Sequence, residues 1–287
     1  MTKLRLDVVG DPIVHSKSPY IHETVLAELN IPYEYRKVQV TKGQLEEYIK
    51  QVKRLGVLGF NLTMPHKVDT LQYLDYVDDE AKIFNSVNTV KIKNGKLLGY
   101  NTDASGMTRA MADKGFFAMG KNIVILGAGG VASTAALKMA MENAADIRLF
   151  NRSLAPAKNI AQNVFDRTGK VISVHPFDYD TLPGHLKDCD ILINCTPLGM
   201  TGTDCDFEDL SFLEFLKPGA LVYDLIYNPA ETSLLKYAKG LELETLNGLG
   251  MLIYQGLLAD EIFLERKLDF DYLGKKIKYI LKNSKIL

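Results

Sequence analysis

The sequence predicts a two-domain α/β protein, and three observations lead to this prediction. Its 287 residues lie in the range of roughly 250–300 at which single hydrophobic cores stop growing and chains divide into domains. Short β-branched runs alternate with amphipathic segments from end to end, which is typical of βαβ units with a mainly parallel sheet. A glycine-rich turn at residues 127–132 lies between a predicted strand and a predicted helix, as in dinucleotide-binding units.

The predicted strands are short runs rich in β-branched and aromatic residues. They lie at residues 4–9, 33–40, 57–63, 123–126, 147–150, 171–174, 190–195, 221–226 and 243–246. The dipeptide Asn94-Gly95 also predicts the turn of a β-hairpin, because both residues tolerate the positive φ angles that a type I′ turn requires.

Helices are predicted where apolar residues recur at helical spacing. These segments are 43–55, 66–77, 104–115 and 248–267. Within 66–77, Val68, Leu71, Leu74 and Val77 recur three apart, and we interpret this face as core packing. Gly115 ends the helix at 104–115, and the boundary between the two domains is predicted near residues 102–104.

Composition favours a small-molecule partner. The 34 Lys and Arg residues balance 35 Asp and Glu residues, and this net charge of −1 gives no field that would attract nucleic acid or an anionic membrane. Neither an N-terminal signal core nor a run of about 18 apolar residues occurs, so we expect a cytoplasmic protein. Cys189, Cys195 and Cys205 lack the spacing of a zinc or redox motif, so no metal or disulfide is expected.

The stretch from residue 123 to 153 has the features of a dinucleotide-binding unit. Gly127 and Gly129 allow a tight turn and close backbone approach, and a helix from about Gly130 would offer free N–H groups to a pyrophosphate. An acid at the end of the next strand usually binds the ribose of NAD. This chain has Arg152 there instead, which favours the additional phosphate of NADP, although a surface arginine is the alternative interpretation.

Polar residues in the first half of the chain form a candidate reaction site. Ser16 and Ser18 alternate by two and could hold a carboxylate, although Ser18 is also a candidate helix N-cap before a proline. Lys67 follows Pro65 in the predicted first turn of a helix, where a cation gains nothing from the helix dipole. Such a placement suits a lysine that transfers a proton, and a lysine that only solvates the surface is the alternative interpretation. Asp103 is an ordinary N-cap candidate, or else one of the polar residues at strand ends where ligands of α/β sheets bind.

Nine motifs together resemble the shikimate dehydrogenase family over Val9 to about Ala259. They are HSKSP (15–19), NLTMPHK (61–67), VNTV (87–90), GYNTDASG (99–106), GAGGVA (127–132), NRS (151–153), NCTPLGM (194–200), YDLIYNP (223–229) and NGLGMLIYQG (247–256). The resemblance implies an N-terminal α/β substrate-binding domain, residues 1–103 plus about 248–287, to which the C-terminal helices return. A Rossmann-like NADP-binding domain would occupy about 104–247.

The resemblance also implies an activity and a set of functional residues. The family interconverts 3-dehydroshikimate and shikimate, a step of aromatic amino-acid and chorismate biosynthesis, with Lys67 and Asp103 as the expected catalytic pair. The expected substrate-binding residues are Ser16, Ser18, Asn61, Thr63, Asn88, Asp103, Tyr227 and Gln255. The expected cofactor-binding residues are Gly127, Ala128, Gly129, Gly130, Val131, Asn151, Arg152, Ser153, Thr196, Leu198, Met200, Leu225, Gly248 and Met251, and Gly250 would lie beside the last of these.

One departure from the family pattern leaves alternatives open. Pro156 stands where the family has a second basic residue, and the nearest cation is Lys158, so NAD use beside NADP is an alternative. A quinate/shikimate dehydrogenase is the nearest alternative activity, although Thr63 favours shikimate. A nucleotide-binding sensor without turnover is an alternative from another class, and the family includes both monomers and homodimers.

Overall fold

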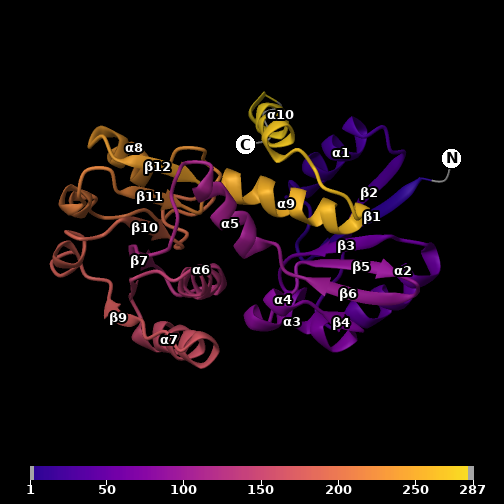
Figure 1. Cartoon of the computed structure of the whole chain (residues 1–287), viewed down its shortest axis with the longest axis horizontal. Helices are drawn as coiled ribbons and strands as arrows, with labels where there is room; N and C mark the ends of the chain where they lie inside the picture. The colour runs from indigo at the N-terminus through magenta and orange to yellow at the C-terminus, as the bar shows by residue number, and fades with distance from the viewer. Residues whose placement is uncertain (1–2, 284–287) are drawn as a thin grey trace. The chain divides into compact units, whose positions relative to one another are not determined.

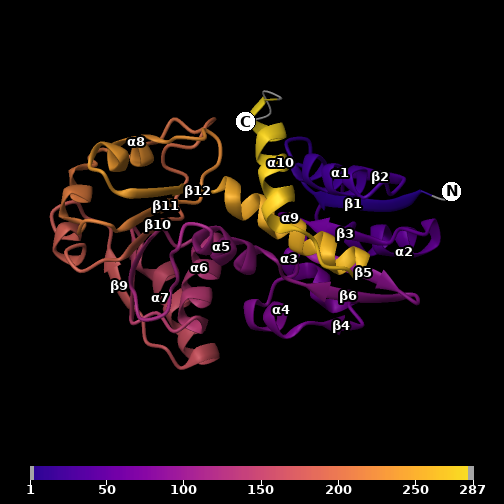
Figure 2. The same ribbon diagram turned by 45° about the horizontal axis from the view of Figure 1, so that its top comes forward.

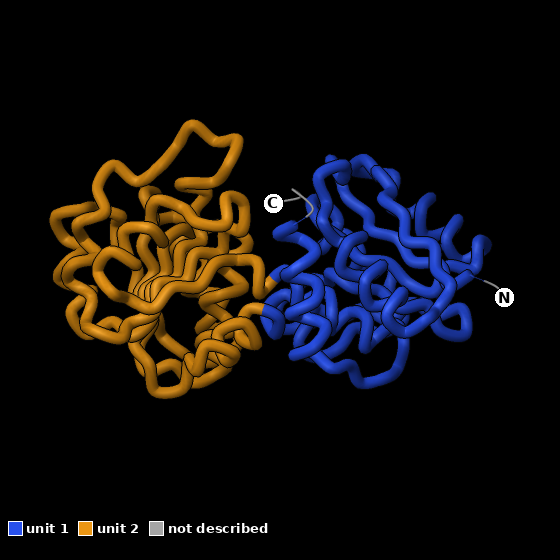
Figure 3. Tube along the Cα trace, turned by 90° about the horizontal axis from the view of Figure 1, so that it is seen from above, with its two compact units in different colours: residues 1–106, 252–286 blue, residues 107–251, 287 orange. Residues whose placement is uncertain are grey.

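The computed structural model describes residues 3–283, and none of the helices within that range is long and apolar enough to cross a membrane. The chain divides into two compact units (Figure 3). The first unit contains the residues up to Gly106 together with those from Leu252 onward, and the second spans Met107–Met251. The chain leaves the first unit within helix α5 (Asp103–Ala112) and returns within helix α9 (Leu249–Leu264).

The first unit is built on a six-stranded mixed sheet (Figure 1). Its strands are β1 (Leu4–Gly10), β2 (Tyr33–Gln39), β3 (Gly59–Leu62), β4 (Tyr76–Val77), β5 (Thr89–Lys93) and β6 (Lys96–Tyr100), in the order β2-β1-β3-β5-β6-β4. Strand β1 pairs in parallel with β2 and β3. The predicted hairpin is confirmed, because β5 and β6 pair antiparallel across Asn94 and Gly95.

Apolar side chains from both faces of this sheet form separate cores. On one face Leu6 and Val8 of β1 pack with Leu26 of helix α1 (Ser18–Glu28) and Phe263 of α9. On the other face Val9 belongs to a cluster with residues of helix α2 (Leu45–Leu55) and the following strands. Helix α3 (His66–Asp69), helix α4 (Asp79–Phe84) and helix α10 (Phe270–Asn283) are the remaining helices described in this unit. Strand β1 is therefore buried on both faces, as a central parallel strand should be.

The helix predicted over residues 66–77 is wrong beyond its first turn. Helix α3 ends at Asp69, a 3₁₀ turn (η1) spans Thr70–Tyr73, and the chain is extended at Leu74 before strand β4. Val68 is 53% exposed, but Leu71, Leu74 and Val77 are partly buried and pack against the core of this unit, so core packing is confirmed for three of the four predicted residues. A strict spacing of three fits a 3₁₀ turn, in which residues i and i+3 are eclipsed, better than an α-helix.

The second unit has a six-stranded sheet in which every pair is parallel. Its strands are β7 (Asn122–Leu126), β8 (Asp146–Asn151), β9 (Ser173–Pro176), β10 (Ile191–Asn194), β11 (Leu221–Asp224) and β12 (Glu244–Asn247), in the order β12-β11-β10-β7-β8-β9. The order reverses between β7 and β10, which is the Rossmann arrangement. Ligands of such sheets bind at the carboxyl ends of the strands near this reversal.

Helices cover both faces of the parallel sheet. Helices α6 (Gly130–Met141) and α7 (Leu154–Thr168) lie on one side, and α8 (Ser233–Gly240) lies on the other (Figures 1 and 2). Two 3₁₀ turns, η2 (Leu182–His185) and η3 (Ser211–Phe215), contribute to a core with buried Val124, Leu192 and Val222. The strands predicted from sequence are all present, with ends shifted by at most two residues, while the short strand β4 was not predicted.

Candidate active site

A lysine and an aspartate from distant parts of the first unit form an ion pair. Lys67 Nζ donates to Asp103 Oδ2 at 2.6 Å, and the two side chains are 30% and 18% exposed. Pro65 is the N-cap of α3, a helix of one turn, so Lys67 faces a carboxylate rather than a long helix dipole. Asp103 does not act as an N-cap with its side chain. Its own backbone N–H donates to Asn101 Oδ1 at 3.0 Å, and its carboxylate is turned toward the lysine.

Asn88 holds the second oxygen of the same carboxylate. Its Nδ2 donates to Asp103 Oδ1 at 2.8 Å and to Thr102 Oγ1 at 2.9 Å, and it lies 3.4 Å from Gln255 Oε1. Its Oδ1 accepts from the backbone N–H of Thr102 at 2.9 Å. The Gln255 amide donates to the carbonyl of Leu252 within α9. Both oxygens of Asp103 therefore have a donor, one cationic and one neutral.

The predicted hydroxyls of the first unit are partly exposed. Ser16, Ser18 and Thr63 are all of intermediate exposure, so each is open to a ligand in part. The backbone N–H of Ser18 approaches Ser16 Oγ at 3.3 Å. Ser18 is not the N-cap of α1, because Lys17 occupies that position and makes no side-chain capping bond. The Ser18 hydroxyl is therefore not used to cap this helix, while the Ser16 oxygen receives the first N–H of the helix at the long distance of 3.3 Å.

Asn61 is buried and engaged by other side chains. It is 5% exposed, its Oδ1 accepts from the Tyr35 hydroxyl at 2.8 Å, and its Nδ2 donates to Thr89 Oγ1 at 3.1 Å. Both the oxygen and the nitrogen of the Asn61 amide are therefore already hydrogen-bonded within the protein. Among the residues predicted to bind substrate in this unit, Asn61 and Asn88 are both buried, at 5% and 2% exposed.

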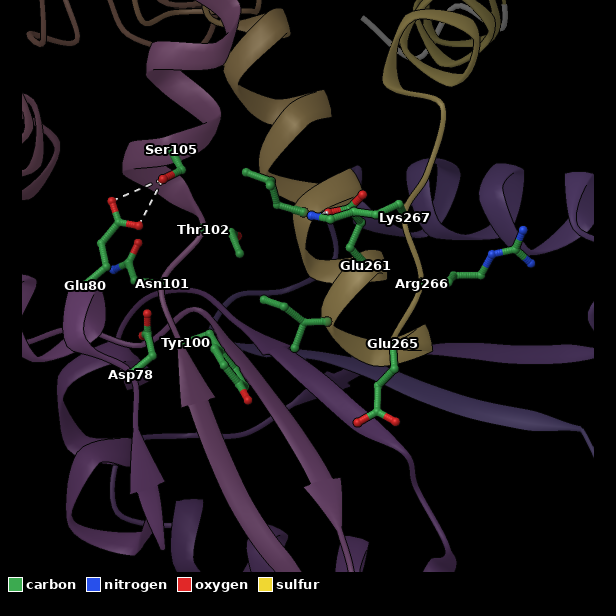
Figure 4. A pocket seen from close by; sticks show the side chains of 12 residues that line it. Asp78, Glu80, Tyr100, Asn101, Thr102, Ser105, Glu261, Glu265, Arg266 and Lys267 are labelled. Atoms are coloured by element: carbon green, nitrogen blue, oxygen red, sulfur yellow. Dashed lines mark hydrogen bonds and ion pairs between the residues drawn. The ribbon is translucent and has the colours of Figure 1, made fainter.

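A cavity of about 390 Å³ lies beside the loop that carries Asp103 (Figure 4). It is lined by Asp78, Glu80, Tyr100, Asn101, Thr102, Ser105, Leu258, Glu261, Ile262, Glu265, Arg266 and Lys267. None of the predicted catalytic or substrate-binding residues lines it. The Ser105 hydroxyl donates to both oxygens of Glu80, which connects the first turn of α5 to α4 across the cavity wall.

The glycine turn of the second unit has an open approach to a helix N-terminus. Gly127 has φ +103°, and a Cβ there would lie 3.1 Å from the carbonyl carbon of Cys195. Gly129 is the N-cap of α6 and makes no side-chain cap, and a Cβ on Gly129 or Gly130 would meet nothing within 4 Å. Ala132 is fully buried where the helix packs on the sheet. The first N–H groups of this twelve-residue helix can therefore receive an anion. Of the other predicted cofactor contacts in this turn, Ala128 is partly exposed and Val131 is exposed.

The turn after β8 presents a free cation. The Asn151 side chain donates to the carbonyl of Ser153 at 2.8 Å, which fixes the turn, and Ser153 is the N-cap of α7 without a side-chain cap. Arg152 is exposed and makes neither a hydrogen bond nor an ion pair with any residue in the described range. Pro156 and Lys158 lie in the first turns of α7 and are exposed. Arg152 is thus available to a ligand without breaking an existing contact.

A buried carboxylate that the sequence interpretation missed supports the ends of β10 and β11. Asp224 is fully buried and accepts from Asn194 Nδ2 at 3.0 Å, from Thr232 Oγ1 at 2.5 Å and from the Ile226 N–H at 3.1 Å. Asn194 Oδ1 in turn accepts from the N–H and hydroxyl of Thr196. Burial raises the pKa of Asp224 to about 6, although the three hydrogen bonds lower it. The sequence signal that could have identified this pair is the polar residue at the end of each of two neighbouring parallel strands, Asn194 in β10 and Asp224 in β11.

Gly248 allows the end of β12 to approach the loop after β11. A Cβ at this position would lie 2.1 Å from the carbonyl oxygen of Leu225, so only glycine fits without movement of the backbone. The other residues predicted around the cofactor in this unit are Leu198, Leu225 and Met251, which are partly exposed, and Met200, which is 40% exposed. Tyr227, predicted to bind substrate, is also partly exposed and belongs to the second unit; burial raises the pKa of its hydroxyl.

Comparison with known proteins places these features in one family. Residues 8–90 match the shikimate dehydrogenase substrate binding domain, and residues 110–199 match the shikimate / quinate 5-dehydrogenase domain. The chain is 39% identical over 285 residues to the shikimate dehydrogenase (NADP(+)) of Methanococcus maripaludis strain C6, covering 99% of this chain and 98% of the relative.

Solved structures give the same result. A crystal structure of a shikimate dehydrogenase in complex with NADP⁺ is 36% identical, with a TM-score of 0.86 and coverage of 96% of this chain and 94% of that one. A Listeria monocytogenes shikimate 5-dehydrogenase in complex with shikimate and NAD is 29% identical, with a TM-score of 0.88 and coverage of 96% of both chains. Similarity over nearly the whole length, at this level of identity, shows that the chain belongs to the shikimate dehydrogenase family.

Proposed function

We propose that this protein is an NADP-dependent shikimate dehydrogenase, which reduces 3-dehydroshikimate to shikimate reversibly in the pathway to chorismate and the aromatic amino acids. The observation that carries this proposal is the Lys67 and Asp103 ion pair, with Asn88 on the second carboxylate oxygen. This arrangement offers a proton donor and a fixed anion, and the same unit carries the partly exposed hydroxyls of Ser16, Ser18 and Thr63, which suit a hydroxylated carboxylic acid. The family relationship supplies the identity of that acid.

The reaction needs a hydride at the ketone carbon and a proton at the ketone oxygen. NADPH, when bound, supplies the hydride. The Lys67 ammonium donates a hydrogen bond to the ketone oxygen, stabilises the negative charge that develops there and delivers the proton. Asp103, at 2.6 Å, orients this ammonium and accepts from the neighbouring substrate hydroxyl. Because the two groups are hydrogen-bonded, replacing either one also changes the position of the other.

The remaining residues of the first unit bind the substrate. Ser16 and Ser18 donate to its carboxylate, and Thr63, Asn88 and Gln255 contact its hydroxyls and carboxylate. Tyr227 of the second unit contributes a further hydroxyl. Asn61 has a supporting role in this proposal, because its amide is buried and already bonded to Tyr35 and Thr89. Residues 1–103 with those from about 248 onward form the substrate domain.

The second unit binds the cofactor. The glycine turn and the start of α6 receive the pyrophosphate, because their N–H groups are uncovered. Arg152 pairs with the 2′-phosphate that distinguishes NADP from NAD. The proposed contacts are Gly127, Ala128, Gly129, Gly130, Val131, Asn151, Arg152, Ser153, Thr196, Leu198, Met200, Leu225, Gly248 and Met251. Pro156 leaves Arg152 without a second cation in the same turn, so some activity with NAD is expected.

Initial rates with shikimate and quinate, each with NADP and NAD, test the proposal. We expect the highest kcat/KM for shikimate with NADP, a lower value with NAD, and little turnover of quinate. A higher kcat/KM for quinate with NAD identifies the alternative, a quinate/shikimate dehydrogenase. Loss of all hydride transfer with either acid would instead support a nucleotide-binding sensor. The same preparation, run on a calibrated sizing column, distinguishes the monomer from the homodimer.

A further inference from the structure

We propose that Tyr35 is a positioning residue for Asp103 and acts on it through Asn61, Thr89 and Asn88. This inference rests on the proposed function, in which Asp103 belongs to the catalytic pair. The four side chains, here called the buried amide chain, come from β2, β3, β5 and the residue before β5. None of them except Asn88 touches Asp103 or Lys67.

Each member of the buried amide chain donates to the next. The Tyr35 hydroxyl donates to Asn61 Oδ1 at 2.8 Å, and Asn61 Nδ2 donates to Thr89 Oγ1 at 3.1 Å. The Thr89 hydroxyl donates to Asn88 Oδ1 at 3.0 Å. Asn88 Nδ2 then donates to Asp103 Oδ1 at 2.8 Å. The chain therefore ends at the carboxylate oxygen that Lys67 does not contact.

One backbone group fixes the direction of every bond in the chain. The N–H of Thr102 can only donate, and it points at the Asn88 side chain at 2.9 Å, so this atom of Asn88 is the oxygen and the amide nitrogen faces Asp103. Thr89 must then donate to that oxygen and accept from Asn61. Asn61 consequently presents its oxygen to Tyr35, which donates.

Burial makes this direction costly to reverse. Tyr35 is 8% exposed, Asn61 5%, Asn88 2% and Thr89 0%, so water cannot replace a missing partner. Turning either amide would place an N–H against another donor and leave a buried oxygen unpaired, which is unfavourable. The Tyr35 ring is itself held by His22, whose ring stacks on it at 4.6 Å between centroids and 10° between planes.

This rigidity bears on the reaction through the orientation of the carboxylate. While the amide of Asn88 is held, Asp103 Oδ1 has a fixed donor, and Oδ2 is left for Lys67 at 2.6 Å. Removing the hydroxyl of Thr89 takes away one of the donors that orient Asn88 and isolates Asn61 and Tyr35 from it. The carboxylate then samples more directions, and the ammonium is less often aligned with the ketone oxygen. None of these residues is among the proposed contacts of NADP.

Two substitutions at Thr89 separate hydrogen bonding from packing. Thr89→Val keeps the shape and removes the hydroxyl, whereas Thr89→Ser keeps the hydroxyl and removes a methyl group. We expect kcat for shikimate oxidation to fall about 5- to 20-fold in Thr89→Val and to stay within about twofold in Thr89→Ser, with the KM for NADP unchanged in both. The apparent pKa of the kcat profile should move only in Thr89→Val. Thermal unfolding of each variant reports whether it is folded.

A second site tests whether the effect passes along the chain. Tyr35→Phe retains the stacked ring, and we expect it to lower kcat about 2- to 5-fold. The double variant Tyr35→Phe/Thr89→Val should be no slower than Thr89→Val alone, because the break at Thr89 already disconnects Tyr35.

Three outcomes would overturn the inference. The first is an equal loss of kcat in Thr89→Val and Thr89→Ser, and the second is a loss of kcat in the double variant that equals the sum of the two single effects in free energy. The third is an unchanged kcat in both Thr89→Val and Tyr35→Phe. If Thr89→Val does not fold, Tyr35→Phe with an unaltered kcat and pH profile also overturns it. An unmodified protein that shows no turnover of shikimate refutes the proposed function instead, so the two failures are distinguishable.

Discussion

Replacing Arg152 by alanine tests the cofactor assignment in this chain. Its guanidinium is exposed and makes no hydrogen bond or ion pair with other residues between 3 and 283, so its removal should change the free energy of unfolding by no more than about 0.5 kcal/mol. A hydrogen bond to a charged group contributes about 1.5–3 kcal/mol, and 1.4 kcal/mol corresponds to a factor of ten. Because Pro156 stands in place of a second basic residue, Arg152 alone would supply the charged hydrogen bond to the 2′-phosphate of NADP.

We therefore expect Arg152→Ala to raise the Kd of NADP by about 10- to 150-fold and that of NAD by less than about threefold. Fluorescence titration of each cofactor measures both constants directly, without the rate terms that enter KM. Lys158→Ala is the matched control, since it removes another exposed cation of the same region, and it should shift either Kd by no more than about threefold. Equal losses of NADP and NAD affinity in Arg152→Ala would refute the phosphate assignment.

Three further predictions follow from other residues. Lys67→Ala should lower kcat by about 100-fold or more with a much smaller change in KM, because a general acid is lost; a raised KM with unchanged kcat in steady-state assays would make Lys67 a binding residue only. Burial raises the pKa of Asp224 from 3.8 to about 6, so the folded chain keeps a proton that the unfolded chain has released, and stability declines as the pH rises through this window. We therefore expect the free energy of unfolding, measured with urea from pH 4 to 7.5, to decline by about 3 kcal/mol less in Asp224→Asn than in the unmodified protein. The same pH dependence in both proteins would contradict the raised pKa of Asp224. Gly248→Ala, whose Cβ would meet a backbone oxygen at 2.1 Å, should cost about 1–3 kcal/mol of stability. Gly240→Ala is its control because open space surrounds that position, and equal unfolding midpoints for the two variants would show that the backbone yields.

The fold could be predicted from sequence where one local rule decides the structure. The glycine turn before α6 and the hairpin at Asn94-Gly95 were predicted because each needs backbone conformations that few residues adopt. The segment after Lys67 was not, because tertiary pairing overrides local spacing there. Residues 76–77 join the sheet edge beside β6, and the preceding turn tightens to 3₁₀ to reach it.

The candidate site was predictable in its residues but not in its supporting contacts. Motifs pointed to Lys67 and Asp103, and the structure brings these side chains to 2.6 Å across 36 positions of sequence. The bonds that hold Asn88 come from Thr89 of β5 and from Thr102 in the loop between β6 and α5, and no spacing along the chain encodes them. The role of Asp224 was not predicted for the same reason, because its hydrogen-bond partners come from β10 and from the N-cap of α8.

The division of the chain into two units separates the residues proposed to transfer the proton from those proposed to bind the cofactor that carries the hydride. Lys67, Asp103 and Asn88, which we propose to position and transfer the proton, belong to one compact unit, while the glycine turn and Arg152, which we propose to bind the cofactor, belong to the other. Selection acting on residues 151–158 can therefore change which redox pool the enzyme draws on without altering any side chain of the proton machinery. The turn after β8 is the place where a lineage, or an engineer, could exchange one cellular supply of reducing power for another.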